Sequence, residues 1–279
     1  MVTNAGLSYS SSRSSMRRRS VAKSRLRNAI AVYVLTLAAT ACTIVALQVT
    51  LTPRWARFFL DYGEHTIFPY PYTIQNFMYC IMAIAFAQLW LRWRAAEGEH
   101  RLLESALLPP DDDESMLEFS DPRLGAIRRD AAEHVGDGRG FFPYLIDVSI
   151  AQFLSTKSID QVIAVFNSSI DIISHRVDLN YQMLRYLIWL IPTIGFIGTV
   201  VGIAVALEGI DANAPDLTRV TERLGIAFYT TIVALIQSMI IYFLQNLIQG
   251  REEHALNRAA SECLKNLINR MYVIQPKAA

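Results

Sequence analysis

Four stretches without Asp, Glu, Lys or Arg constrain what this 279-residue chain can fold into. Each of them reaches or exceeds the roughly 20 residues that a helix needs to cross about 30 Å of hydrocarbon. The second stretch opens with two prolines, so its helix is expected to begin near Thr73. We therefore predict an all-α membrane protein whose four transmembrane helices lie near residues 29–51, 72–92, 187–208 and 224–249. The charge-free runs themselves are 28–53, 65–91, 186–207 and 224–250.

The positions of Lys and Arg predict the orientation of these spans. Of the 26 basic residues, 22 lie in residues 1–27, 92–185 and 251–279, and four lie in the two short connecting loops. The positive-inside rule then places both termini in the cytoplasm. We expect a multi-pass protein of a bacterial inner (plasma) membrane. Its outside loops are too short for a receptor domain, so work outside the membrane would fall to another chain.

The chain divides into five segments by composition, of which the first three precede residue 158. Residues 1–27 are rich in Ser and Arg and are predicted to be a disordered basic tail drawn to anionic lipid. No aromatic residue is interleaved with the tail's basic cluster, so nucleic-acid binding is not expected. Residues 28–93 are predicted to form a transmembrane hairpin, and residues 94–157 a cytoplasmic helical region.

Two long helices are predicted to extend into the cytoplasm. A capping-box pattern begins at Ser158, and apolar residues follow it at helical spacing without a proline until Pro192. One helix should therefore run from the cytoplasm into the third span. The fourth span continues past Arg251 with the same periodicity, which predicts a cytoplasmic C-terminal helix within residues 251–279.

Small residues form a matching stripe on the third and fourth spans. Gly195, Thr199, Gly202 and Ala206 fall at i, i+4, i+7 and i+11, and Ala227, Thr231, Ala234 and Ser238 repeat that spacing. Small residues let membrane helices approach closely, and hydroxyls can bond the backbone one turn earlier. Alternatively, the stripes could line a path that holds water and hydroxyls beside a moving ion. Spacing alone leaves both interpretations open.

The spans carry no acidic residue in mid-membrane, and the sequence shows no cluster of metal ligands. Glu208 and Glu222 stand at the ends of the spans, and no carboxylate lies in the middle of one. Proton relays in membranes generally use Asp, Glu or His. Either the chain does not conduct, or a partner supplies the acid. The three cysteines and five histidines are scattered, so we expect no metal, no cofactor and no enzyme activity.

Two motifs resemble the MotA/TolQ/ExbB proton channel family. The segment Pro192–Gly202, with the pattern Gly-x-x-Gly-Thr-Val-x-Gly, resembles the second helix of TolQ and ExbB and the third of MotA. The stretch Ala227–Leu235 resembles the final helix of the same family. The motifs occur in the same order on adjacent long helices, and residues 158–250 would form the channel core.

The resemblance implies a mechanism that fits the missing acid. Such subunits form a homo-oligomeric ring, typically a pentamer, around a single-span TolR/ExbD/MotB-like partner that carries an intramembrane aspartate. Thr199 and Thr231 would face that aspartate, with Thr230 and Ser238 next along the ion path. The packing motif would comprise Pro192, Gly195, Gly198, Gly202, Ala227 and Ala234. The chain would then be a subunit of a proton- or sodium-driven motor or energy-transducing complex.

The chain departs from the family pattern at several positions, among them Ala234, where relatives often have glycine. TolQ-like proteins have a glutamate where this chain has Ile226, and a later proline where it has Ile240. The loss of the glutamate leaves an alternative open: a non-conducting membrane scaffold of the same fold that docks cytoplasmic proteins. The sequence does not distinguish protons from sodium, nor does it indicate which process is energised.

Overall fold

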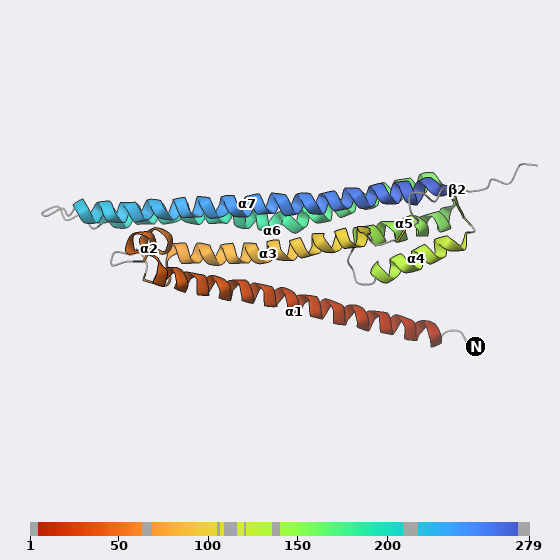
Figure 1. Ribbon diagram of the computed structural model, residues 1–279, viewed down its shortest axis with the longest axis horizontal. Coiled ribbons are helices and arrows are strands. Elements are labelled where there is room, and N and C mark those ends of the chain that lie inside the picture. The colour runs from red at the N-terminus through yellow and green to blue at the C-terminus, as the bar shows by residue number, and fades with distance from the viewer. Residues whose placement is uncertain are drawn as a thin grey trace, which may run out of the picture. The chain divides into compact units, whose positions relative to one another are not determined.

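The computed structural model describes residues 5–62, 69–104, 107–108, 116–119, 121–135, 140–208 and 217–272. Helices dominate this part of the chain (Figure 1). They are α1 (Ala5–Thr50), α2 (Pro53–Leu60), α3 (Ile74–Glu104), α4 (Pro122–Val135), α5 (Phe141–Thr156), α6 (Ile159–Glu208) and α7 (Leu217–Asn266), followed by a 3-10 turn, Ile268–Arg270. Two short strands, β1 (Leu117–Glu118) and β2 (Met271–Tyr272), complete the elements.

The chain forms two compact units. The membrane unit comprises residues 28–91 and 181–247, and the polar unit comprises 1–27, 92–180 and 248–279. The helices α1, α3, α6 and α7 are long and apolar enough to cross a membrane. This confirms the predicted all-α membrane protein with four spans.

The helix α1 begins earlier than its sequence suggested. It starts at Ala5, so most of the tail predicted to be disordered is helical in the structure. No proline lies between Ala5 and Thr50, so nothing in the backbone chemistry stops the helix of the span from continuing toward the amino terminus. Threonines within the span bond their own backbone one turn earlier, as Thr40 does to Thr36 O at 2.9 Å.

The helices α6 and α7 each contain 50 residues, as the uninterrupted periodicity predicted. At 1.5 Å per residue such a helix is about 75 Å long, well beyond the thickness of the hydrocarbon layer. The amino end of α6 carries the predicted cap, in which Gln161 N donates to Ser158 Oγ at 3.5 Å. Pro192 lies inside α6 without ending it.

The polar unit contains two features that the sequence did not reveal. Strands β1 and β2 pair in parallel, with Leu117 opposite Met271 and Glu118 opposite Tyr272. Helices α4 and α5 lie side by side (Figure 1), and Arg128 of α4 forms an ion pair with Asp147 of α5 at 2.9 Å. The region predicted simply as helical therefore also pairs a strand with the end of the chain.

Candidate functional site

The two small-residue stripes meet where α6 and α7 approach most closely. A Cβ atom added to Gly195 would lie 2.4 Å from the Cβ of Ala234 and 3.3 Å from the carbonyl oxygen of Thr230. No side chain fits at such distances, so glycine is required at position 195. Ala234 is fully buried, which places its methyl group against the backbone of α6.

Three threonine hydroxyls gather at this crossing, and we call Thr199, Thr230 and Thr231 the hydroxyl cluster. The hydroxyls of Thr199 and Thr231 contact each other across the two helices. Thr231 Oγ1 donates to Gly195 O at 3.0 Å, and Thr230 Oγ1 donates to Ala227 O at 2.7 Å. Thr199 Oγ1 also lies 3.0 Å from Ala227 O, on the facing helix. The cluster thus brings three hydroxyls to two backbone carbonyls.

The members of the hydroxyl cluster differ in exposure. Thr230 is fully buried within the chain, whereas Thr199 and Thr231 are partly exposed. Thr199 and Thr231 therefore retain some surface outside the chain, whereas Thr230 retains none. Within a single chain, Thr230 acts as a packing residue between the helices.

The remaining residues singled out in the sequence lie along the same interface. Ser238 Oγ donates to Ile188 O at 2.9 Å, again from α7 to α6. A Cβ on Gly198 would lie 3.1 Å from both the Cδ1 of Ile74 and the Oγ1 of Thr230. The other members of the packing motif are buried or half-buried: Pro192, Gly202 and Ala227.

A second polar face of α7 was missed in the sequence. Thr230, Gln237 and Gln245 follow at i, i+7 and i+15, and all three are buried in the membrane unit. Neither amide atom of Gln237 has a hydrogen-bond partner among the described residues. The heptad-like spacing of polar residues in an apolar helix was the available signal.

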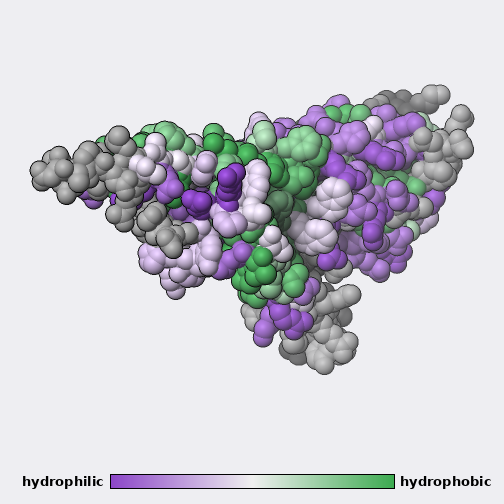
Figure 2. Space-filling model, turned by 60° about the vertical axis from the view of Figure 1, so that its left-hand side comes forward, coloured by the Kyte–Doolittle hydropathy of each residue, from purple (hydrophilic) through white to green (hydrophobic). Residues whose placement is uncertain are grey.

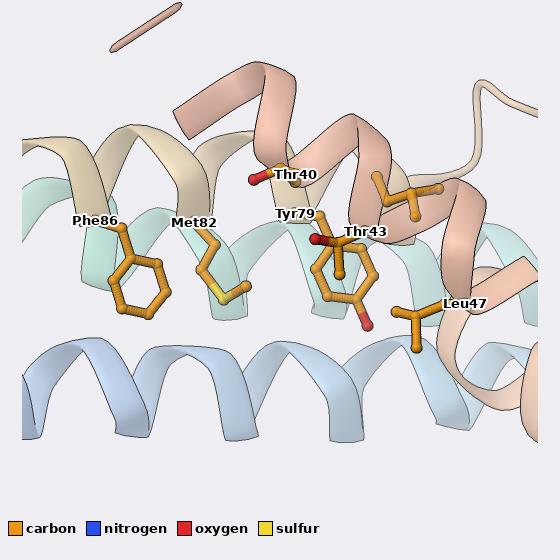
Figure 3. Close-up of a pocket in the computed structure, with 7 residues that line it drawn as sticks. Thr40, Thr43, Leu47, Tyr79, Met82 and Phe86 are labelled. Carbon is orange, nitrogen blue, oxygen red and sulfur yellow. The ribbon is translucent and has the colours of Figure 1, made fainter. Parts of the chain in front are cut away.

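A cavity of about 200 Å³ lies between α1 and α3 rather than at the hydroxyl cluster. Figure 3 shows Thr40, Thr43 and Leu47 of α1 and Tyr79, Met82 and Phe86 of α3 around it. The threonine hydroxyls are bonded within α1, as Thr43 Oγ1 is to Ala39 O at 2.8 Å. The lining is mostly apolar, as expected where hydrocarbon chains lie against helices. Among the described residues no group of His, Cys, Asp or Glu side chains is placed to hold a metal ion.

Large apolar side chains are exposed on both helices that carry the hydroxyl cluster. Hydrophobic residues gather on the surface in Figure 2, where they appear in green. Burying such side chains is strongly favourable, and a soluble monomer rarely exposes so many together. This surface therefore suits lipid or other protein chains. Exposed examples in the membrane unit are Phe196, Val200, Leu207, Phe228, Met239 and Phe243.

The four spans and their paired long helices define a multi-pass helical membrane protein. Residues 145–260 match the model of the MotA/TolQ/ExbB proton channel family. This match contains the whole hydroxyl cluster and supports the resemblance to that family predicted from the sequence. No curated protein and no solved structure matches the chain.

Proposed function

We propose that this chain is the ring-forming subunit of a proton- or sodium-driven motor or energy-transducing complex. The observation that carries the proposal is the contact between the Thr199 and Thr231 hydroxyls at partly exposed positions. These hydroxyls lie on the helices that match a proton channel family. A second chain that packs against this face would meet oxygen atoms in an otherwise apolar surface.

The charge pattern supports a partner that carries an acid. The four charge-free runs contain hydroxyls and amides but no carboxylate. A hydroxyl can pass a proton along but does not hold an extra one near neutral pH. A single-span partner with an intramembrane aspartate, as the family resemblance implies, would supply the missing group. A membrane potential then contributes about 2.3 kcal/mol per charge per 100 mV to each transfer.

The exposed apolar surface supports a homo-oligomer, and a pentamer is the arrangement that the resemblance implies. The ring would lie in the inner membrane of a bacterium with both termini in the cytoplasm, as the distribution of basic residues predicts. Thr199 and Thr231 would then line the path, with Ser238 following toward the cytoplasm.

The test begins with the native complex. The protein is purified from its own membrane in mild detergent, and the partner is identified by mass spectrometry. The complex is reconstituted in vesicles, and ion uptake is followed with pH-sensitive and sodium-sensitive dyes. A Thr231→Val variant keeps the side-chain shape and removes the hydroxyl, so we expect assembly without ion flux. Thr231→Ser, which retains the hydroxyl, is the matched control and should conduct.

Two outcomes would reject the ion path. Unchanged flux in Thr231→Val would show that the hydroxyl at position 231 carries no ion. A wild-type ring that purifies without a single-span partner and conducts nothing would favour the non-conducting scaffold instead. That second function has support of its own, because the carbonyls of Gly195 and Ala227 already accept all three hydroxyls. Its expected signature is stoichiometric copurification of a cytoplasmic protein.

A further inference from the structure

Four polar side chains are buried where α2 ends and α3 begins, within the membrane unit. Asp61 follows α2 directly and is 2% exposed. Thr73, Gln75 and Asn76 stand at the start of α3, and they are 1%, 0% and 7% exposed. Buried polar groups of this kind are normally hydrogen-bonded, so the partners of each atom decide what the junction can bind.

The side-chain donors of Thr73, Gln75 and Asn76 are hydrogen-bonded, whereas several acceptor oxygens at this junction have no donor among the described residues. Thr73 Oγ1 donates to Leu60 O at 3.2 Å, Gln75 Nε2 to Phe58 O at 3.3 Å, and Asn76 Nδ2 to Pro71 O at 2.8 Å. Three oxygen atoms have no hydrogen-bond partner in the part of the chain that the structure describes. They are Asp61 Oδ1, Gln75 Oε1 and Asn76 Oδ1. The junction therefore has three unpartnered acceptor oxygens, one of them on a carboxyl group.

Three described basic groups on the neighbouring helices are engaged or exposed. Arg57 of α2 lies 3.9 Å from Glu222 of α7, and Arg223 of α7 donates to Val205 O at 3.2 Å. Arg54 is exposed to solvent. With burial as its cause, the pKa of Asp61 rises to about 7. An unpaired carboxylate taken out of water favours its protonated form, because burial destabilises the charge.

The junction also reaches the hydroxyl cluster. Ile74 stands between Thr73 and Gln75 in the sequence, and its side chain packs at Gly198 of α6. The space at Gly198 is bounded on its other side by Thr230 Oγ1. This contact places the start of α3 beside Thr230, the buried member of the hydroxyl cluster.

We propose that Asp61 is a proton-binding site that takes up protons for the proposed channel from the side of the membrane carrying the loop at residues 51–70. A proton from water on that side adds to the Asp61 carboxylate and gives a neutral carboxylic acid. The unpartnered oxygens of Gln75 and Asn76 in the same junction are the candidate acceptors for the acid O–H. Release of the proton to water or to the aspartate of the proposed partner restores the carboxylate. The site deepens the proposed function, and it supplies from this chain an acid that the four spans lack.

The first experiment measures protonation directly, without reference to ion flux. Infrared difference spectra of the full-length ring are recorded in detergent across a pH titration. We expect a carboxylic-acid C=O band that titrates with a midpoint near the raised pKa of Asp61, about 7. The band should disappear in Asp61→Asn and persist in Glu222→Gln, which removes an exposed carboxylate from α7. In Asp61→Glu the band should shift but remain.

A titration that is identical in wild type and Asp61→Asn would overturn the proposal. So would a midpoint in the range of an exposed aspartate, about 4. The titration is repeated with sodium chloride in place of potassium chloride. We expect no change, and a midpoint that falls as sodium rises would replace the proton site by a sodium site.

The second experiment separates this inference from the proposed function. In reconstituted vesicles, Asp61→Asn should lower proton flux by at least about tenfold, because positioned proton-transfer groups contribute roughly a hundredfold or more. Normal flux in Asp61→Asn, together with loss of flux in Thr231→Val, would reject the role of Asp61 and leave the ring channel standing. A wild-type complex without flux would reject the channel, while the infrared titration would still decide whether Asp61 binds a proton.

Discussion

Ser238 of α7 donates a hydrogen bond of 2.9 Å to the carbonyl oxygen of Ile188 on α6. Pro192, four residues after Ile188, has no N–H group, so this carbonyl lacks its usual donor within the helix. No water is available in hydrocarbon to replace that donor. A side chain of α7 therefore completes the backbone hydrogen bonding of α6 and makes the proline tolerable inside the span.

This relationship predicts a dependence between positions 192 and 238. Ser238→Ala should lower the free energy of unfolding by about 1 kcal/mol, in the range measured for hydrogen bonds between membrane helices. In a Pro192→Ala background the restored N–H group serves Ile188, so the same change should cost close to nothing. Unfolding is followed by tryptophan fluorescence in detergent. Equal costs in the two backgrounds would refute the dependence. Thr193→Val is the control, since its hydroxyl bonds Trp189 O within α6.

The close approach at Gly195 predicts a strong effect of a single methyl group. Gly195→Ala would place Cβ atoms 2.4 Å apart, so α6 and α7 must separate. We expect a loss of about 1–3 kcal/mol of stability, typical of overpacking, together with disruption of the hydroxyl cluster. Gly225→Ala on α7 is the control, because nothing lies within 4 Å of the added Cβ and alanine favours a helix. Thermal unfolding of both variants and their flux after reconstitution measure the difference. A Gly195→Ala variant as stable as Gly225→Ala would contradict the packing described here.

A buried carboxyl group in the polar unit predicts a pH effect on stability. Glu99 of α3 is 9% exposed, and its Oε2 accepts the N–H of Phe141 at the start of α5 at 2.8 Å. Burial raises the pKa of Glu99 in spite of the N–H groups of Phe141 and Gly140, and the charge of Glu252 raises it further. Because the folded state holds this proton more tightly than the unfolded state, stability falls as the pH rises through the pKa of the folded state.

Glu99→Gln removes the charge but keeps an oxygen for the Phe141 N–H. We expect the variant to gain melting temperature over wild type at about pH 8, and to gain less at about pH 5, where Glu99 is more often protonated. Glu97→Gln is the control. Glu97 is more exposed and forms a 3.7 Å ion pair with Arg101, so its removal should change stability by less than about 0.5 kcal/mol at either pH. A gain that is the same at both values would show that Glu99 does not titrate in this range.

Much of the architecture follows from local patterns in the chain. The four spans could be predicted because a run without charge long enough to cross the membrane has few alternatives. The continuity of α6 and α7 could be predicted because helix-breaking residues are missing at the membrane surface. The spacing of small residues along each helix also indicated a close approach between the helices that carry Gly195 and Ala234. In each case the signal lies within one helix.

What escaped prediction depends on residues far apart in the chain. Asp61 stood in a short loop and Glu99 in a region predicted only as helical, and nothing in the sequence indicated that either would be buried. Neither sequence neighbourhood indicates burial, because burial is created by elements that arrive from elsewhere. For residues 5–27 the prediction was wrong in the opposite sense. Their composition predicted disorder, whereas they continue the helix of the first span.

The sequence by itself determined how many times this chain can cross a membrane, which helices are long, and which family its core resembles. Those properties follow from hydropathy, charge and helical period, which are set residue by residue. Only the tertiary structure decided that Ser238 serves the carbonyl left free by Pro192, that Thr230 is closed off while Thr199 and Thr231 remain partly open, and that Asp61 is buried among unpartnered oxygens. The physical reason is that hydrogen-bond partners and desolvation are properties of packed neighbours, and packing is defined only once the helices meet.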